Sequence, residues 1–262
     1  MLLPLLGLVY FLAFSPHAVL SLFELVSYSP IQQCGPFNVS FAGGIPPTAP
    51  LTLTVLPFNS TPLAFTVPQS AWDNSTASGS FVTFLPLPEG VSLMASLDDA
   101  SGNSAALTSE VLQIGSSDNT SCISTANTTD PSTFRLLNTT VSQCSPFSVA
   151  HNFSSPDYPI SVRVLIPAGL SPWLQRTSLY SGQGVDTFTF VMNVARGFQV
   201  ALLFDDIRGN RQVSDLLSVA GGESTPTNCL QIASTTSTGA TSASSLSTSA
   251  PSSAIPHLRL IR

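Results

Sequence analysis

Apolar and polar residues alternate with a period of two along much of the chain. The pattern is clear in Phe37–Phe41, Leu51–Val55 and Val91–Leu97, and it recurs in Ile160–Ile166 and Phe198–Phe204. Successive side chains of a strand point to opposite faces of a sheet, so the alternation predicts strands with one buried face. Pro, Gly, Asn and Ser bound these segments at short spacing. Such spacing is typical of an antiparallel β-sandwich.

The chain carries one sequence unit twice. Residues 33–39 (Gln-Cys-Gly-Pro-Phe-Asn-Val) return as residues 143–149 (Gln-Cys-Ser-Pro-Phe-Ser-Val) at an offset of 110, and Val55–Pro57 aligns with Leu165–Pro167 at the same offset. Residues 97–103 (Leu-Asp-Asp-Ala-Ser-Gly-Asn) return as residues 204–210 (Phe-Asp-Asp-Ile-Arg-Gly-Asn) at an offset of 107. Residues 109–112 (Ser-Glu-Val-Leu) return as residues 214–217 (Ser-Asp-Leu-Leu). Because several blocks recur in the same order, we expect two tandem domains of one fold.

The predicted fold class is all-β, with two tandem immunoglobulin-like antiparallel β-sandwich domains. An apolar run followed by small residues predicts a signal peptide at the start. A stretch of Ser, Thr, Ala, Gly and Pro near the end cannot bury a core and predicts a disordered, O-glycosylated stalk. The expected segments are a signal peptide at 1–21, repeat 1 at 22–123, a linker at 124–135, repeat 2 at 136–231 and a disordered tail at 232–262.

One cysteine opens each repeat and one closes it. The four residues allow three pairings, and Cys34–Cys122 with Cys144–Cys229 treats the two copies alike. We therefore expect one disulfide clasp in each domain. The alternative joins Cys122 to Cys144 across the linker and Cys34 to Cys229. Either pairing indicates an oxidising compartment.

Charge and sequons agree with export. The chain has no lysine, 8% charged residues and a formal net charge of −6. This balance argues against nucleic-acid binding, which needs clustered cations. No apolar run after the signal region is long enough to span a membrane, and we expect a secreted protein located outside the cell or in a cell wall. Seven Asn-x-Ser/Thr sequons are candidate glycan acceptors, namely Asn38, Asn59, Asn74, Asn119, Asn127, Asn138 and Asn152.

The residue types needed for common enzyme chemistry are scarce. Of three histidines only His151 falls in a predicted domain, and its counterpart in the first copy is Phe41. A core or edge position suits His151 better than the role of a general base. With the cysteines paired, thiol chemistry and zinc binding are not expected. We predict no catalytic residue and no cofactor.

Two sets of residues are candidates for ligand contacts. The Asp-Asp-x-x-Gly-Asn block has the composition of a hairpin turn; the alternative is a calcium site built from Asp99 and Asn103, with Asp206 and Asn210 in the second copy. Trp72 and Trp173 would suit stacking on sugar rings, whereas the alternative makes them partly buried loop anchors.

The paired Gln-Cys-x-Pro-Phe blocks, the Leu-Asp-Asp-x-x-Gly-Asn block and the Ser/Thr-rich tail together resemble a family of surface proteins from mushroom-forming fungi. In that family two such repeats follow a signal peptide, and many members continue past the stalk into a membrane span and a cytoplasmic tail. The present sequence instead ends in residues 256–262, Pro-His-Leu-Arg-Leu-Ile-Arg. The resemblance implies no catalytic or binding residues.

These observations favour a non-enzymatic extracellular glycoprotein that is associated with a cell wall or surface. Its role would be adhesive, binding or structural, and its partner a cell-wall polysaccharide or another surface protein. One alternative is a carbohydrate-binding accessory module or hydrolase. Others are a purely structural spacer and a truncated form of a single-span membrane protein of the wall-sensor kind.

Overall fold

The computed structural model describes residues 23–44, 48–123, 133–138, 140–151, 160–181 and 186–232. Regular secondary structure in these residues is β-strand, apart from the short 3-10 helices η1 (Gln69–Ala71) and η2 (Asn228–Ile232). The predicted signal peptide at 1–21 and the Ser/Thr-rich tail from residue 233 onward lie outside the described residues, as do the sequons at Asn127 and Asn152.

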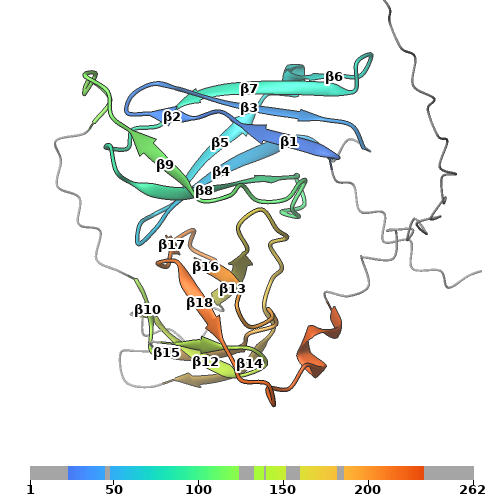
Figure 1. Cartoon of the computed structure of the whole chain (residues 1–262), viewed down its shortest axis with the longest axis vertical. Helices are drawn as coiled ribbons and strands as arrows, with labels where there is room; N and C mark the ends of the chain where they lie inside the picture. The colour runs from blue at the N-terminus through green and yellow to red at the C-terminus, as the bar shows by residue number, and fades with distance from the viewer. Residues whose placement is uncertain are drawn as a thin grey trace, which may run out of the picture.

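The first copy is a sandwich of a four-stranded and a five-stranded sheet (Figure 1). The four-stranded sheet has the order β1 (Leu25–Tyr28), β3 (Pro36–Ala42), β7 (Ser78–Phe84) and β6 (Trp72–Asp73). The other has the order β2 (Ile31–Gln32), β9 (Leu112–Gly115), β8 (Ser92–Asp98), β4 (Leu51–Pro57) and β5 (Leu63–Val67).

The second copy repeats this arrangement except for the fifth strand of its larger sheet. One sheet has the order β10 (Phe134–Leu136), β12 (Pro146–His151), β15 (Asp186–Val191) and β14 (Arg176–Ser181). The other has the order β11 (Val141–Ser142), β18 (Leu217–Ala220), β16 (Gln199–Asp206) and β13 (Ile160–Leu165). The fifth strand, β17 (Arg211–Val213), pairs with β16 and does not take the place that β5 has beside β4. The predicted fold class, two tandem immunoglobulin-like β-sandwiches, is therefore confirmed.

Two details of the sequence prediction are wrong. The linker was expected to reach residue 135, but β10 begins at Phe134, whose ring is 2% exposed and packs 5.7 Å from the ring of Phe204. The alignment of Val55–Pro57 with Leu165–Pro167 is shifted by one residue. Leu56 pairs with Met94 in the first copy, and Leu165 pairs with Ala201 in the second. Met94 and Ala201 are 107 residues apart, like the Asp-Asp blocks, so they occupy equivalent positions. Their partners Leu56 and Leu165 are then equivalent too, and these are 109 residues apart, not 110. Similar aliphatic residues on both faces of these strands concealed the register.

Each sandwich has its own apolar core, formed by the inward-facing side chains of its two sheets. Strands β4, β8, β13 and β16 also bury their outward-facing side chains. Together with Val213 of β17 they form a third apolar cluster. It consists of Leu56 and Met94 from the first copy and Leu165, Ala201, Leu203 and Val213 from the second, with Phe58 at its margin. The two sandwiches thus pack sheet against sheet, and the molecule is a stack of four sheets (Figure 1).

A buried ion pair lies at the same interface. Arg163, on β13, is 2% exposed, and its Nη2 lies 2.7 Å from Oδ1 of Asp98 on β8. The guanidinium also donates to the backbone oxygen and hydroxyl of Ser171, at 3.0 and 2.7 Å. The carboxylate further accepts the hydroxyl of Ser96 at 2.9 Å. Both charges are therefore hydrogen-bonded as well as paired, as burial of charge requires.

Backbone hydrogen bonds join the two copies at both margins of the interface. At one margin the Val213 N–H donates to the oxygen of Ser60 at 2.9 Å. At the other, the Thr108 N–H donates to the oxygen of Gly169 at 2.9 Å, and the Ala168 N–H donates to that of Ser109 at 3.0 Å. Backbone pairing, apolar packing and a buried ion pair act together here, so the two sandwiches form one rigid unit.

Candidate functional site

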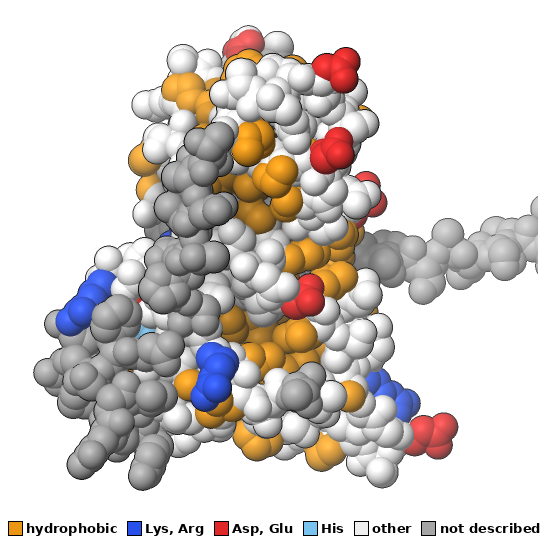
Figure 2. Space-filling model, turned by 90° about the vertical axis from the view of Figure 1, so that its left-hand side faces the viewer, with side chains coloured by type: hydrophobic (Ala, Val, Ile, Leu, Met, Phe, Trp, Pro, Cys, Tyr) orange, Lys and Arg blue, Asp and Glu red, His pale blue; other side chains and the backbone are white. Residues whose placement is uncertain are grey.

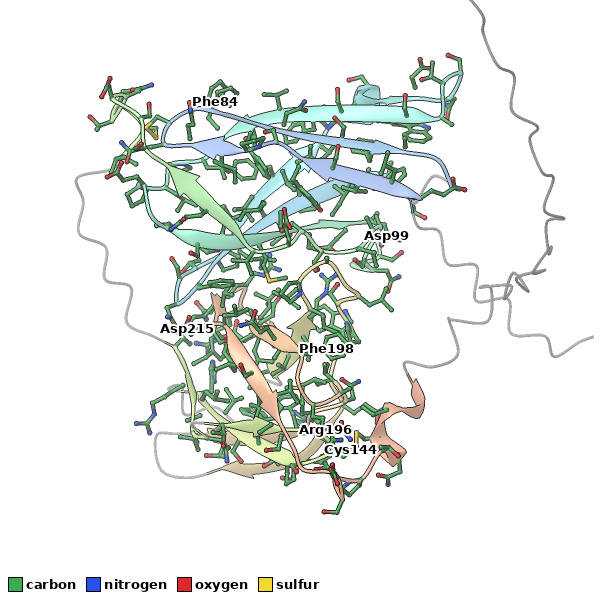
Figure 3. All side chains as sticks on the ribbon, in the orientation of Figure 1. Phe84, Asp99, Cys144, Arg196, Phe198 and Asp215 are labelled. Carbon is green, nitrogen blue, oxygen red and sulfur yellow. A yellow bond between two sulfur atoms is a disulfide. The ribbon has the colours of Figure 1, made fainter. Side chains whose placement is uncertain are left out.

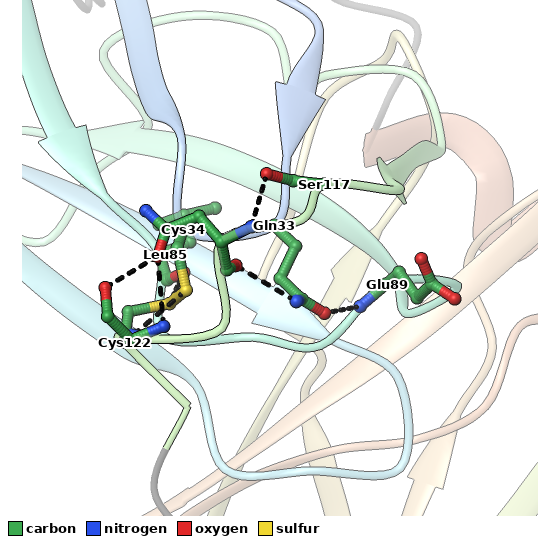
Figure 4. The surroundings of a disulfide bond; sticks show 8 residues. Gln33, Cys34, Leu85, Glu89, Ser117 and Cys122 are labelled. Atoms are coloured by element: carbon green, nitrogen blue, oxygen red, sulfur yellow. Dashed lines mark hydrogen bonds between the residues drawn. A yellow bond between two sulfur atoms is a disulfide. The ribbon is translucent and has the colours of Figure 1, made fainter.

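The Gln-Cys motif is a structural brace in the first copy. Gln33 is 6% exposed, and its Nε2 donates to the backbone oxygen of Asn119 at 3.1 Å. Its Oε1 accepts the N–H of Glu89 at 2.8 Å. The neighbouring Cys34 forms a disulfide with Cys122. One side chain therefore holds the segment before the second cysteine against the loop that precedes β8 (Figure 4).

The second copy repeats every part of this brace. Gln143 donates to the oxygen of Pro226 at 2.7 Å and accepts the N–H of Arg196 at 2.8 Å. Cys144 forms a disulfide with Cys229, and Cys144 and Arg196 lie close together at the end of the sandwich that faces away from the first copy (Figure 3). Both predicted disulfide pairs are confirmed. The role of the glutamine escaped the sequence analysis, although its recurrence at the 110 offset was the available signal.

The Asp-Asp-x-x-Gly-Asn block forms a tight turn in both copies. Oδ1 of Asp99 accepts the N–H groups of Ser101 and Asn103, both at 2.9 Å. Oδ1 of Asp206 accepts the N–H groups two and four residues further on at the same distance. These carboxylate oxygens are engaged by the backbone, as the hairpin interpretation requires. Among the described residues, no group of three or more His, Cys, Asp and Glu side chains is arranged to hold a metal ion.

The two aspartates of the second turn have pKa values shifted in opposite directions. Burial raises the pKa of Asp205, an effect that Arg211, at 3.3 Å, partly offsets. Burial also acts to raise the pKa of Asp206, but hydrogen bonds from Asn210, Arg208 and His151 outweigh it and hold the pKa below its usual value. Asp206 is therefore a carboxylate that the turn stabilises in its charged form.

His151 is part of the core of the second sandwich. It is 1% exposed, its Nε2 lies 3.2 Å from Oδ2 of Asp206, and its ring stacks on Phe134. In the first copy the cross-strand pair at this place is Phe41 with Gly79, and in the second it is His151 with the buried Asp186. The second copy thus replaces an aromatic contact with a polar cluster. His151 therefore occupies a core position, as the sequence analysis favoured.

Trp72 lies at the corner between η1 and β7, and other aromatic rings cover it. Its ring is nearly parallel to that of Phe41, with 6.1 Å between centroids, and lies 5.3 Å from that of Phe23. A Cβ on Gly79 would overlap the Phe41 ring and the backbone oxygen of Ala71, so the packing requires glycine there. The indole N–H donates to Oδ1 of Asn74 at 2.7 Å. Trp72 is therefore a partly buried anchor.

Trp173, in contrast, is exposed at the seam between the two sandwiches. The Trp173 side chain is 43% exposed, and the guanidinium carbon of the interface residue Arg163 lies 5.6 Å from its ring centroid. A cation beside an indole fixes the orientation of the ring. The exposed Leu170 and Leu107 flank the nearby backbone pairing between the copies. The structure does not bring the two tryptophans together. Trp173 is the more exposed of the two, whereas Trp72 is partly buried and lines a pocket of about 260 Å³.

The sequons that the structure describes are exposed, and Asn38 lies on the outward face of β3. They are Asn38, Asn59, Asn74, Asn119 and Asn138. At Asn138 the side-chain oxygen accepts the N–H of Ser148 at 2.7 Å. Since a glycan is attached through the side-chain nitrogen, this bond orients the attachment atom without consuming it.

The fold and its braces define a class of rigid tandem β-sandwich proteins. No protein-family profile and no curated protein matches the chain. Among solved structures it is similar to a two-domain fibronectin type III segment of chicken tenascin, at 12% identity and a TM-score of 0.26, over 75% of this chain and 96% of that one. It is also similar to the SGBP-B protein of the Bacteroides ovatus mixed-linkage glucan utilization locus, solved with a mixed-linkage heptasaccharide. That match has 11% identity and a TM-score of 0.26, over 74% of this chain and 43% of that one. None of the described helices is long and apolar enough to cross a membrane.

Proposed function

We propose that the protein is a non-enzymatic extracellular glycoprotein with a binding or adhesive role at a cell wall or surface. One observation carries this proposal: several polar residues that recur in both copies are engaged in internal hydrogen bonds. The Gln-Cys brace and the Asp turn follow this rule, and so do Ser109 and Ser214, whose hydroxyls accept the N–H groups of Ala95 and Leu202. The polar residues that these motifs share between the two copies therefore stabilise the fold.

The disulfides and the surface support a location outside the cytosol. Both disulfides close long loops, with sequence separations of 88 and 85 residues, and such bonds persist where thiols are not kept reduced. Only 8% of the residues are charged, and on the face that Figure 2 shows, apolar groups are exposed over both sandwiches. Glycans on the five exposed sequons would supply hydration that charge does not.

The candidate contact residue is Trp173, and the corresponding ligand class is a polysaccharide. An exposed indole can stack on the apolar face of a sugar ring. Its position on a rigid seam would limit the entropy lost on binding. A purely structural spacer is the second candidate, and the extent of the interface between the copies favours it.

Binding to immobilised and insoluble cell-wall polysaccharides tests the proposal. The secreted protein is compared with a Trp173→Ala variant and with a Phe84→Ala variant. Phe84 is 60% exposed and lies on the first sandwich, away from the interface, so it is a matched exposed aromatic (Figure 3).

Saturable binding that is lost in Trp173→Ala and kept in Phe84→Ala supports the polysaccharide proposal. Binding that both variants retain contradicts the role of Trp173. The absence of any saturable ligand favours the spacer, and turnover of a polysaccharide substrate contradicts the non-enzymatic assignment.

A further inference from the structure

The first sandwich has an open groove along its edge strand β1. The groove has a volume of about 480 Å³ and lies between β1 and the segment that connects β8 to β9. Figure 1 shows β1 on the near side of this sandwich, with the connecting segment below it. Val26 and Tyr28 line one wall, and Leu107, Thr108 and Glu110 line the other.

The backbone of β1 presents to this groove hydrogen-bonding groups that no other described residue engages. Ser29 donates its N–H to the oxygen of Asn38 at 2.9 Å, and the antiparallel register continues from there through β1. Backbone groups of alternate residues point toward the partner strand or away from it. The N–H and C=O groups of Val26 and Tyr28 therefore point away from β3, into the groove. An edge of this kind is a template for another strand.

The opposite wall does not compete for these groups. The Thr108 N–H is bonded to Gly169 and the Ser109 N–H to Ala95, so the connecting segment is held by the second sandwich and by β8.

The hydroxyl of Tyr28, a groove-lining residue, is buried without a hydrogen-bond partner among the residues that the structure describes. Burial and the charge of Asp98 raise the pKa of this phenol, so it remains a hydrogen-bond donor.

The net charge of the first sandwich indicates the charge of the ligand that would bind in the groove. Residues 23–123 contain seven acidic residues and no Lys or Arg, because all eight arginines of the chain follow residue 134. Glu24 and Glu110 line the groove. Asp98, a further carboxylate of this sandwich, already has a cation from the second copy in Arg163. The negative electrostatic potential of the remaining carboxylates attracts cationic partners.

We propose that this groove binds an extended, basic peptide segment of a partner protein, which adds as a strand to the free edge of β1. Main-chain hydrogen bonds to Val26 and Tyr28 hold such a segment, as in other cases of strand addition. Its apolar residues face the groove wall, and its basic residues approach Glu24 and Glu110. A second copy of this chain is a poor occupant, because two such edges would bring these carboxylates together.

The test uses the secreted full chain and a fluorescent heptapeptide in which valine alternates with arginine. Fluorescence anisotropy measures its binding beside two control peptides. In one, glutamate replaces arginine. In the other, the arginine/valine backbone is N-methylated at alternate residues, which removes the N–H donors of one edge. We expect binding to weaken about ten-fold or more for each control, since two or three hydrogen bonds or ion pairs are lost.

Matched protein variants locate the site. Val26→Pro removes the one N–H of that residue, which faces the groove, and an edge strand tolerates proline at such a position. Val26→Thr keeps the N–H and serves as its control. Glu110→Arg reverses one charge. The proposal predicts that Val26→Pro and Glu110→Arg weaken binding about ten-fold and that Val26→Thr does not.

Hydrogen exchange of residues 23–30, with and without the arginine/valine peptide, reads out strand addition directly and does not depend on the folding of any variant. Added protection of this segment is expected. The proposal is overturned if the arginine/valine peptide does not bind at millimolar concentration, if the N-methylated peptide binds equally well, or if residues 23–30 gain no protection.

Discussion

Replacement of Arg163 by alanine would leave Asp98 in the interface between the sandwiches without its counter-ion. The carboxylate would keep its bond to Ser96 at 2.9 Å but lose the guanidinium at 2.7 Å. The first sandwich has no cation of its own to replace it. Removal of one partner of a buried ion pair costs about 3–5 kcal/mol, because the other charge stays buried and uncompensated.

The size of this effect allows a direct measurement. For a cooperative unit of this length, a loss of 3–5 kcal/mol corresponds to a fall in Tm of roughly 6–20 °C. Calorimetry and urea unfolding under oxidising conditions measure it. The matched control is the double variant Arg163→Met with Asp98→Leu, which removes both charges and keeps apolar volume. We expect it to recover most of the lost stability.

Two results would refute the reasoning. A change below about 1 kcal/mol in Arg163→Ala is typical of an exposed pair and would mean that the interface opens in solution. A double variant as unstable as Arg163→Ala would mean that the loss comes from packing and not from the unpaired carboxylate.

Three further predictions concern the braces, the turn and the sequons. Gln143→Leu leaves the Arg196 N–H and the Pro226 oxygen unbonded, so urea unfolding should show a loss of about 1–3 kcal/mol. Because the pKa of Asp206 is lowered in the fold, its contribution is present above its unfolded pKa of about 3.9 and is lost as pH falls through the folded value. The stability difference between wild type and Asp206→Asn should therefore be largest near neutral pH and shrink below about pH 4; a difference that does not change with pH would contradict this. Asn138→Gln should lower the mass of the secreted protein by one glycan, and an unchanged mass would show that this sequon is unoccupied.

The internal repeat made the disulfides and the fold class predictable. Each cysteine has a counterpart at a similar position in the other copy, so one pairing treats the copies alike, and alternation identified the inward faces of the longer strands. The hairpin interpretation of the Asp-Asp-x-x-Gly-Asn block likewise followed from local turn chemistry. These features depend on local sequence or on comparison between the copies.

The contacts between the copies could not be read from the sequence in the same way. Arg163 occupies an outward position on its strand, which alternation alone assigns to solvent, and its partner Asp98 lies 65 residues away. The outward Leu56 and Leu165 resembled further core residues and concealed both the register and the third apolar cluster. Packing between domains depends on which faces meet, and no local pattern encodes that choice.

Hydrogen exchange at Val213, Thr108 and Ala168 tests most directly whether the two sandwiches form one rigid unit. Each N–H donates to a backbone oxygen of the other copy, at 2.9, 2.9 and 3.0 Å. If the interface is permanent, these amides exchange only through unfolding, with protection close to that of core amides in β8 and β16. Exchange at the rate of exposed loops, while the core amides stay protected, would show that the sandwiches separate and would contradict the rigid pair.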